Sequence, residues 1–416
     1  MPTPVDELAR RSKVASRQLA GASTDDKDAG LLAAADLLLE RAPDVLAANT
    51  ADLEDAAAGG MAEGPLDRLR LTDARLTGMA EGLRKVAGLQ DPVGEVLDST
   101  ERPNGLRIER VRVPLGVVAI IYENRPNVTS DAAGLCLKSG NAAILRGSGT
   151  ALRSNLAIAG VLREALEKVG LPEDGVIVVD DVAHEAATRL MQLTELVDCL
   201  IPRGGPDLIQ SIRENATVPV VIDGDGNCHV YVDAAADLDE AEAIVLNAKT
   251  QRTSVCNAAE SLVVHEGIAD VFVPRVCAAL AERGVELLGD AAARARCSEM
   301  GEATDADFGQ EFLDMKLTVA VAADLGAAID HINRFGTGHT EAILTEDADA
   351  ARRFSEEIDA AVVVVNASTR FTDGEEFGLG AEIGISTQKL HARGPMGLRE
   401  LTTYKYLVWG DGQIRE

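Results

Sequence analysis

Aromatic residues and long apolar runs are both scarce in this chain of 416 residues. Only 3% of the residues are aromatic although 46% are hydrophobic, so Ala, Val, Leu and Ile must fill the core. No stretch approaches the roughly 20 apolar residues that cross a bilayer, and the N-terminus has no apolar segment of signal-peptide length. We therefore expect a cytoplasmic protein without membrane contact, and a length that corresponds to two or three domains.

Basic residues are also few. Lys and Arg total 40 against 68 Asp and Glu, which gives a formal net charge of −28. So acidic a surface repels phosphate backbones and anionic lipid heads, and this excludes nucleic acids and membranes as expected partners. An anionic substrate or cofactor must then be met by a local basic pocket.

Several common site motifs are absent. The six cysteines form no C-x-x-C pair, the six histidines form no H-x-x-x-H or H-E-x-x-H pattern, and no G-x-S-x-G elbow occurs. These absences predict reduced cysteines, no disulfide framework and no metal site.

Residues 1–90 are rich in Ala and Leu with charges at helical spacing, which predicts amphipathic helices. Beyond them, short apolar runs alternate with helical segments. The expected strands are 117–123, 142–145, 176–180, 199–202 and 218–222. This alternation predicts a parallel, doubly wound, Rossmann-type sheet, in which ligands lie beyond the carboxyl ends of the strands.

A second α/β unit begins near Cys228. Its expected strands are 229–233, 261–265, 317–321, 342–344 and 361–365. We assign residues 1–227 to a cofactor-binding domain and 228–366 to a catalytic domain. Residues 367–416 are expected to return to the first domain and end in an oligomerisation tail, YKYLVW, for which a simple edge strand is the alternative. Residues around 106–115 alternate apolar and polar as a half-exposed strand does, and we assign them to a hairpin that contributes to oligomerisation.

Two strand-to-helix turns are candidates for phosphate contact. One is 146–150, with Arg146, Gly147 and Ser148, and the other is 202–206, with Gly204 and Gly205. Glycine lets the backbone approach a ligand closely, and a helix N-terminus favours an anion. Glycines at such turns are more often simple turn residues, and neither turn is a complete nucleotide-binding fingerprint. Arg146 would suit a ribose 2′-phosphate, which favours NADP over NAD.

Cys256 stands apart from the other cysteines. It follows a polar stretch that contains Lys249 and Arg252, which can raise the thiolate fraction of a nearby thiol. A single cysteine is more often a small buried apolar residue, and Cys136, Cys199 and Cys277 fit that interpretation. Cys256 precedes an expected strand by a few residues, so we place it in an exposed loop at a domain junction.

Long ordered motifs in the chain resemble one family. They are residues 113–155, 245–265, 331–351, 365–374 and 378–398. In these the chain is similar to the glutamate-5-semialdehyde dehydrogenases, also called gamma-glutamyl phosphate reductases, of the aldehyde dehydrogenase superfamily. The similarity extends from about residue 5 to Arg415.

The resemblance implies a reaction and roles for individual residues. The family reduces L-glutamyl 5-phosphate with NADPH to glutamate 5-semialdehyde, the second step of proline biosynthesis, through a thioester on the cysteine that matches Cys256. Asn124 matches the superfamily's oxyanion-stabilising asparagine, and Glu311 matches the glutamate that contacts the nicotinamide ribose. The resemblance also implies a homo-oligomer, a dimer or tetramer, and pathway logic suggests association with glutamate 5-kinase.

The basic residues inside the matched motifs are candidates for binding the amino-acid end and the phosphate of the substrate. They are Arg125, Lys249, Arg252, Arg370, His391 and Arg393. Each is as readily explained by structural hydrogen bonds, so no partner is assigned to any of them from the sequence.

One absence bears on the fate of the thioester. Hydrolytic aldehyde dehydrogenases carry a glutamate general base about 34 residues before the cysteine, where this chain has Ile222. A site without that base would protect the thioester from water and leave it to phosphate. A gap of one residue would put Asp223 there instead, and Asp223-Gly224 is also where the chain departs from relatives that carry a basic or polar pair.

Three alternatives stay open at this point. A hydrolytic aldehyde dehydrogenase of the same fold would oxidise another aldehyde without phosphate. A non-catalytic oligomeric scaffold would not need Cys256, Asn124 or the glycine turns. A thiol hydrolase would need a histidine partner for Cys256, and the sequence designates none.

Overall fold

The structure is a computed structural model that describes residues 2–222 and 224–415, and it divides into two compact units. The first unit comprises the described residues up to Ile222, Leu379–Gly384 and the described residues from Met396 on. The second comprises residues 224–378 and Ile385–Pro395.

Helices make up the N-terminal part of the first unit, as predicted. They are α1 (Val5–Leu19), α2 (Thr24–Glu40), α3 (Ala42–Ala58), α4 (Glu63–Leu69) and α5 (Asp73–Ala87). Ser23 and Asp26 form a capping box that satisfies free N–H groups at the start of α2. Thr72 caps α5 by accepting from the N–H of Arg75. These side chains set where the helices begin.

The sheet of the first unit has four parallel strands in the order β5-β4-β3-β6. The strands are β3 (Val117–Tyr122), β4 (Ala142–Arg146), β5 (Val176–Val178) and β6 (Cys199–Arg203), and the helices around them are α6 (Asn127–Lys138), α7 (Leu152–Lys168), α8 (His184–Met191) and α9 (Pro206–Asn215). Because β4 and β6 lie on opposite sides of β3, the strand order reverses between β3 and β6. Ligand sites of such sheets form at this reversal, beyond the carboxyl ends of the strands.

The fifth expected strand of this sheet, 218–222, was wrong as a strand. This segment makes one isolated parallel bridge, between Val220 and Leu200. Pro219 has no N–H and cannot donate to a ladder, although its carbonyl accepts from the N–H of Leu200 at 2.8 Å.

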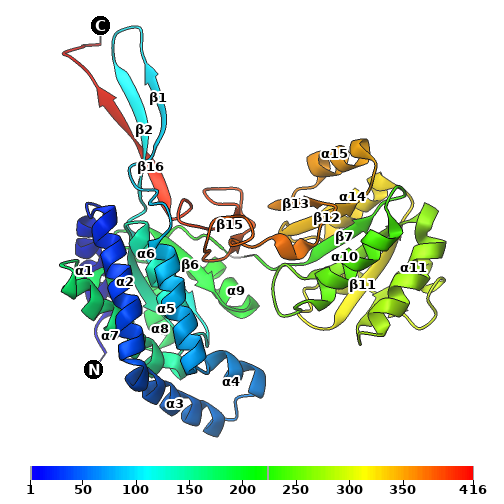
Figure 1. Ribbon diagram of the computed structural model, residues 1–416, viewed down its shortest axis with the longest axis horizontal. Coiled ribbons are helices and arrows are strands. Elements are labelled where there is room, and N and C mark those ends of the chain that lie inside the picture. Colours follow the sequence, from blue (N-terminus) through cyan, green and yellow to red (C-terminus); the bar gives the residue numbers. More distant parts are fainter. Residues whose placement is uncertain (1, 223, 416) are drawn as a thin grey trace. The chain divides into compact units, whose positions relative to one another are not determined.

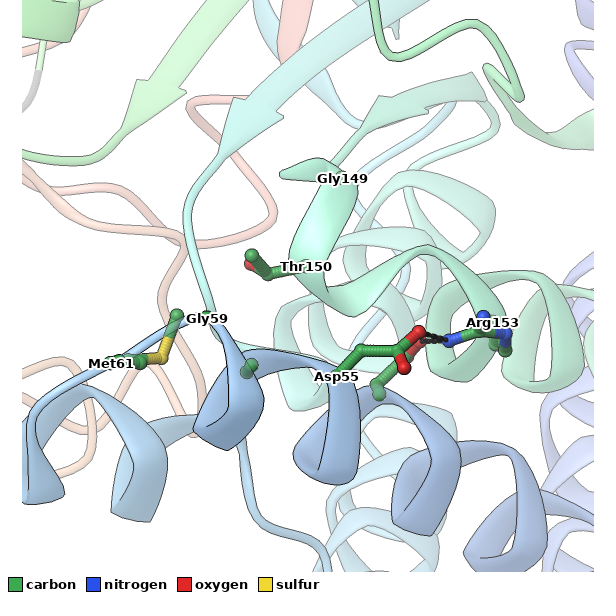
Figure 2. A pocket seen from close by; sticks show the side chains of 9 residues that line it. Asp55, Gly59, Met61, Gly149, Thr150 and Arg153 are labelled. Carbon is green, nitrogen blue, oxygen red and sulfur yellow. Dashed lines mark hydrogen bonds and ion pairs between the residues drawn. The ribbon is translucent and has the colours of Figure 1, made fainter.

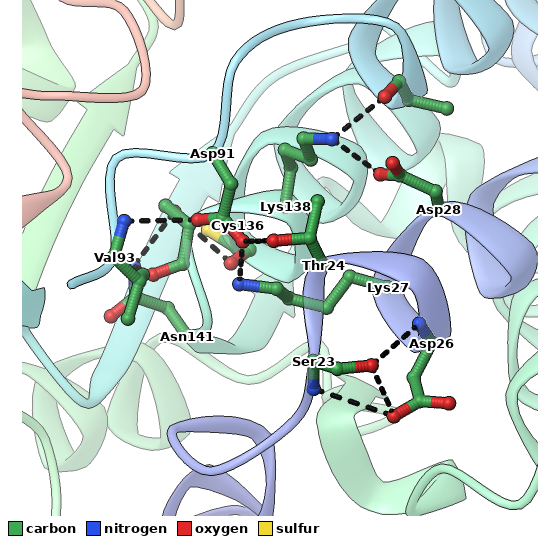
Figure 3. A network of polar contacts seen from close by, with 12 residues as sticks. Ser23, Thr24, Asp26, Lys27, Asp28, Asp91, Val93, Cys136, Lys138 and Asn141 are labelled. Carbon is green, nitrogen blue, oxygen red and sulfur yellow. Dashed lines mark hydrogen bonds and ion pairs between the residues drawn. The ribbon is translucent and has the colours of Figure 1, made fainter. Parts of the chain in front are cut away.

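Two buried lysines of the first unit form ion pairs that join separate segments of the chain (Figure 3). Lys27 of α2 pairs with Asp91, and Lys138 of α6 pairs with Asp28. Both ammonium groups are almost fully enclosed, so each depends on its carboxylate partner. This network is structural, because its polar atoms are used within the protein.

A three-stranded antiparallel sheet, β1 (Val96–Glu101), β2 (Arg107–Pro114) and β16 (Thr402–Trp409), extends away from the helices of the first unit (Figure 1). The expected hairpin near 106–115 supplies only one of its strands, since β2 pairs with the preceding β1 and with the C-terminal β16. Tyr404, Tyr406 and Trp409 on β16 are about half exposed. That this sheet serves oligomerisation stays a prediction.

The second unit contains a seven-stranded parallel sheet in the order β10-β9-β11-β8-β7-β12-β13. Its strands are β7 (Cys228–Val232), β8 (Ala259–His265), β9 (Glu286–Gly289), β10 (Gly301–Glu302), β11 (Lys316–Ala322), β12 (Thr340–Leu344) and β13 (Val362–Val365). Its helices are α10 (Leu238–Thr250), α11 (Glu266–Ala281), α12 (Ala291–Arg294), α13 (Asp305–Phe308), α14 (Leu325–Phe335) and α15 (Ala348–Glu357). The predicted second α/β unit is therefore present, built around an aliphatic core.

The chain does not leave the second unit at residue 367, where the return to the first domain was expected. Residues up to Gly378 stay with the second unit, because the side-chain amide of Asn257 donates to the carbonyl of Thr372 at 2.8 Å. The segment 385–395 also belongs to the second unit, and its ends pair as β14 (Ile385–Ser386) and β15 (Gly394–Pro395). Such long-range contacts are not visible in the sequence.

Among the described residues, no helix is both long and apolar enough to span a bilayer.

Candidate active site

Cys256 lies in a turn between α10 and β8, the position expected from the sequence apart from the domain junction, which stays a prediction. Of the six thiols, only those of Cys256 and Cys297 are half-buried, and the others are buried. Burial raises the pKa of Cys199 to about 12 and that of Cys136 still further. Those buried thiols are poor nucleophiles at neutral pH, since the thiolate is the reactive form.

Two residues that were not predicted from the sequence contact the backbone carbonyl of Cys256. The thiol of Cys228 donates to the carbonyl of Cys256 at 3.2 Å. Gly226 lies so close that a β-carbon on it would be 1.6 Å from the same carbonyl oxygen. Only glycine fits there, and a glycine two residues before the first residue of β7 was the available signal.

Glu311 also approaches this turn. Its Oε1 accepts from the N–H of Gly226 at 2.9 Å. Gly226 in turn packs against the carbonyl of Cys256, so Glu311 is linked to the cysteine turn through Gly226. Glu311 is half-buried in the loop between α13 and β11. Its expected role toward a nicotinamide ribose stays a prediction.

Lys249 is placed differently from expectation. Its ammonium is enclosed and lies 2.5 Å from the carboxylate of Glu260, and both side chains have no solvent exposure. Burial lowers the pKa of Lys249, an effect that Glu260 opposes. A lysine so enclosed does not reach a substrate, so its predicted substrate contact does not fit the structure. The partner Glu260 lies on β8, four residues beyond the cysteine.

Arg370 lies against the cysteine turn. The amide of Asn257 donates to the carbonyls of Arg370 and Thr372, and the hydroxyl of Thr369 donates to the carbonyl of Asn257 at 2.7 Å. Burial lowers the pKa of Arg370, and the nearby charge of Arg252 acts in the same direction. The structure therefore brings Arg370 and Arg252, both predicted candidates, to the neighbourhood of Cys256.

His391 and Arg393 lie on the segment between β14 and β15. Arg393 donates to Oδ1 of Asp359 at 2.7 Å, and Lys389 pairs with the other oxygen. His391 is exposed and has a φ of 69°. The carboxylate of Asp359 balances the positive charge of Arg393, so this ion pair explains the position of Arg393 without a bound ligand.

In the first unit, Asn124 is at the predicted place, just after β3. Its φ is 24°, an uncommon value for a non-glycine residue. Its side-chain oxygen accepts from the hydroxyl of Ser148 at 2.7 Å and from that of Thr150. Because the two hydroxyls engage the oxygen of the planar amide, the amide presents its NH₂ group in the opposite direction.

The 146–150 turn follows β4 and contains the expected cofactor residues. The guanidinium of Arg146 donates to the carbonyl of Val182 at 2.7 Å, and a β-carbon on Gly147 would lie 2.1 Å from the side-chain amide nitrogen of Asn155. That amide nitrogen is buried without a partner among the described residues. The hydroxyls at this turn and the basic Arg146 suit a phosphate-bearing ribose.

A cavity of about 450 Å³ adjoins this turn. Figure 2 shows Gly149 and Thr150 on one side of it, with Gly59 and Met61 on the other and Arg153 paired to Asp55. The cavity offers space beside the predicted cofactor turn.

At the second predicted phosphate turn, residues 202–206, a carboxylate of the protein itself contacts the glycines. The N–H of Gly205 donates to the carboxylate of Glu123 at 3.1 Å, and a β-carbon on Gly204 would lie 2.9 Å from the same carboxyl group. A phosphate here would meet this anion unless Glu123 moved. Phosphate contact by Gly204 and Gly205 stays a prediction, as does a substrate role for Arg125, which is exposed. Asp223 lies outside the described residues.

The chain is similar to known proteins over nearly its whole length. The aldehyde dehydrogenase family model matches residues 3–295, and the chain belongs to this family. Within it, the chain belongs to the gamma-glutamyl phosphate reductases. It is 56% identical to the enzyme of Carboxydothermus hydrogenoformans over 98% of both chains, and 53% identical to that of Thermobifida fusca over 99% of this chain and 98% of the relative. The crystal structure of the Thermotoga maritima gamma-glutamyl phosphate reductase has a TM-score of 0.98 at 48% identity, covering 100% of both chains.

Proposed function

We propose that this protein reduces L-glutamyl 5-phosphate to L-glutamate 5-semialdehyde and phosphate with NADPH, the second step of proline biosynthesis from glutamate. The observation that carries the proposal is the turn of Cys256, which has a half-buried thiol and a backbone in close contact with Gly226 and Cys228. The names and identities of the relatives support the choice of substrate.

The chemistry begins with the thiolate of Cys256. It attacks C5 of the acyl phosphate, a carbon–sulfur bond forms, and the bond from C5 to the phosphate oxygen breaks so that phosphate leaves with the electron pair. The resulting thioester accepts a hydride at C5 and a proton at its oxygen. The thiohemiacetal then releases the aldehyde and restores the thiol.

Two donors are proposed to stabilise the negative oxygen that develops at C5. One is the NH₂ group of Asn124, whose amide orientation is fixed by Ser148 and Thr150. The other is the backbone N–H of Cys256. Preorganised donors of this kind stabilise a transition state without the cost of reorganising water.

When bound, the nicotinamide cofactor supplies the hydride. Arg146, Gly147 and Ser148 would hold its phosphate-bearing ribose, and Glu311 would accept from the hydroxyls of the nicotinamide ribose. The guanidinium at the end of β4 supports NADP over NAD, since it suits a 2′-phosphate.

The proposal extends to the setting of the enzyme. We place it in the cytoplasm as a homo-oligomer, a dimer or tetramer, supplied with its unstable acyl phosphate by glutamate 5-kinase. The exposed aromatic residues of β16 support self-association. Sedimentation of a variant truncated before β16 tests the oligomer: a mass unchanged from that of the full chain would contradict this assignment.

The decisive experiment follows the reverse reaction, the reduction of NADP⁺ with glutamate 5-semialdehyde, with and without inorganic phosphate. We expect turnover to require phosphate and to be lost in Cys256→Ser, while Cys297→Ser, the other half-buried thiol, stays near wild type. Turnover without phosphate would favour the hydrolytic alternative and sink the proposal. Assays with NAD⁺ in place of NADP⁺ test the cofactor.

A further inference from the structure

A polar cavity of about 310 Å³ lies in the second unit, at the end of α10. Asn247 and Gln251 line it from α10 and its C-terminal cap, and the chain from Arg370 to Glu376 lines it from the opposite side. Asn247 and Gln251 are four residues apart and so share one face of the helix. The cavity therefore has walls from two segments more than a hundred residues apart in the sequence.

Arg370 is the basic group of this cavity, and its side chain is held in place. Its Nε donates to Oε1 of Gln251 at 2.8 Å. That bond engages Nε and not the two terminal nitrogens of the guanidinium. A guanidinium restrained in this way loses little freedom when it binds a carboxylate with two parallel hydrogen bonds.

Carboxylates line the same cavity beside the guanidinium. They belong to Asp373, Glu375 and Glu376. Oδ1 of Asp373 accepts from the backbone N–H groups of Glu375 and Glu376, at 2.8 and 3.4 Å, which fixes its position. The cavity thus combines one positive group with neighbouring negative groups, an arrangement that matches a zwitterion better than a simple anion.

The cavity is attached to the nucleophile through Asn257. This residue follows Cys256. Its side-chain amide donates to the carbonyls of Arg370 and Thr372, and its own carbonyl accepts from the hydroxyl of Thr369. Burial lowers the pKa of Arg370 and the charge of Arg252 acts in the same direction, while Asp373 and then Cys256 oppose this. The wall of the cavity is therefore bonded directly to the residue that follows Cys256.

We infer that this cavity binds the amino-acid end of the substrate, with Arg370 on the α-carboxylate and Asp373 on the α-ammonium group. This inference rests on the proposed function. In the substrate the α-carbon is three carbon–carbon bonds from C5, the carbon bonded to Cys256 in the thioester. The short chain between the two ends requires a recognition site near the nucleophile. This cavity meets that requirement through Asn257, the residue after Cys256, which bonds to the wall segment at Arg370 and Thr372.

Three aldehydes separate the two contacts in the reverse reaction with phosphate and NADP⁺. L-Glutamate 5-semialdehyde has both charged groups, 4-aminobutanal lacks the carboxylate, and 5-oxopentanoate lacks the ammonium group. We expect Arg370→Met to lower kcat/KM about 100-fold for the two aldehydes that carry the carboxylate, and to change it less than about threefold for 4-aminobutanal. Asp373→Asn, which keeps the Oδ1 acceptor, should reduce the rate only for the two aldehydes that carry the ammonium group.

Arg353→Met is the matched control, since Arg353 pairs with Glu357 on the exposed face of α15, and it should behave as wild type. Equal losses for all three aldehydes in Arg370→Met would assign Arg370 a purely structural role and overturn the inference. Arg370→Lys serves if the methionine variant does not fold: it keeps the charge but not the fork, and its loss must again be confined to the aldehydes with a carboxylate. No phosphate-dependent turnover of glutamate 5-semialdehyde by the wild type would instead refute the proposed function.

Discussion

The ammonium of Lys249 lies 2.5 Å from the carboxylate of Glu260, and neither side chain reaches solvent. These residues come from α10 and β8, the two elements that flank the turn of Cys256. The second oxygen of Glu260 accepts from the N–H of Leu313 at 3.0 Å. Burial raises the pKa of Glu260 to about 7, while the charge of Lys249 opposes that rise. The pair therefore supports the turn of Cys256 from the buried interior of the second unit.

Lys249→Met should destabilise the protein strongly. It would leave the carboxylate of Glu260 enclosed without its cation, and the free energy of unfolding should fall by about 3–5 kcal/mol. The double variant Lys249→Met with Glu260→Gln should recover most of this loss, because Gln can still accept from Leu313. Urea denaturation measures both, and a single variant as stable as wild type would contradict the assigned pairing.

Gly226→Ala should impair catalysis through the position of Cys256. A β-carbon would lie 1.6 Å from the carbonyl oxygen of Cys256, so the turn must shift. A displacement of about 1 Å at a reacting group can lower the rate about 100-fold, and we expect a loss of at least that size in kcat. Gly160→Ala on α7 is the control: its β-carbon meets nothing within 4 Å. This control should keep full activity and gain about 0.5–1 kcal/mol in stability.

Asn124→Asp should lower kcat about 100- to 1000-fold. The change keeps an oxygen for Ser148 and Thr150 but removes the NH₂ donor proposed for the oxyanion. Ser148→Ala should have a much smaller effect, because the hydroxyl of Thr150 still orients the amide. Steady-state kinetics of the two variants measure this difference. Wild-type kcat in Asn124→Asp would remove Asn124 from the mechanism.

The buried His339 predicts a loss of stability in mild acid. Burial lowers its pKa from 6.5 to about 4, so the unfolded chain takes up a proton at a higher pH than the folded one. The contribution is fully present above pH 6.5 and is lost as the pH falls toward 4, by up to about 3 kcal/mol. Thermal unfolding between pH 7.5 and 4.5 should show a smaller decline in Tm for His339→Gln than for wild type. His184→Gln, at an exposed histidine, should follow the wild-type decline, and parallel curves for all three proteins would contradict the prediction.

Much of the fold could be predicted because its strands are buried on both faces. Val117–Tyr122 is completely buried, and such a strand appears in the sequence as an uninterrupted apolar run. The segment 218–222 has the same texture but makes only one bridge, because the pattern does not show how many ladder bonds a segment at the edge of a sheet will form. The three-stranded sheet was only partly foreseen, since β2 and β16 pair across almost three hundred residues.

The candidate site was predicted unevenly for a similar reason. Cys256 was identified from its polar surroundings and from the motif around it, both of which are local in the sequence. Gly226 and Cys228 were missed, because their importance comes from contact with the carbonyl of Cys256 about thirty residues away. The roles of Asn124 and Glu311 were inferred from resemblance, and their side-chain partners came from the structure.

The α/β architecture, the family and Cys256 as the proposed nucleophile all followed from the sequence alone, because burial patterns and long motifs are local features of the chain. Only the tertiary structure decided what each basic residue near that cysteine faces. Lys249 and Arg370 were equal candidates in the sequence, yet one is enclosed with Glu260 and the other borders a cavity. The physical reason is that the partner of a charge is set by contacts between distant segments, such as the bond between Arg370 and Gln251 across 119 positions.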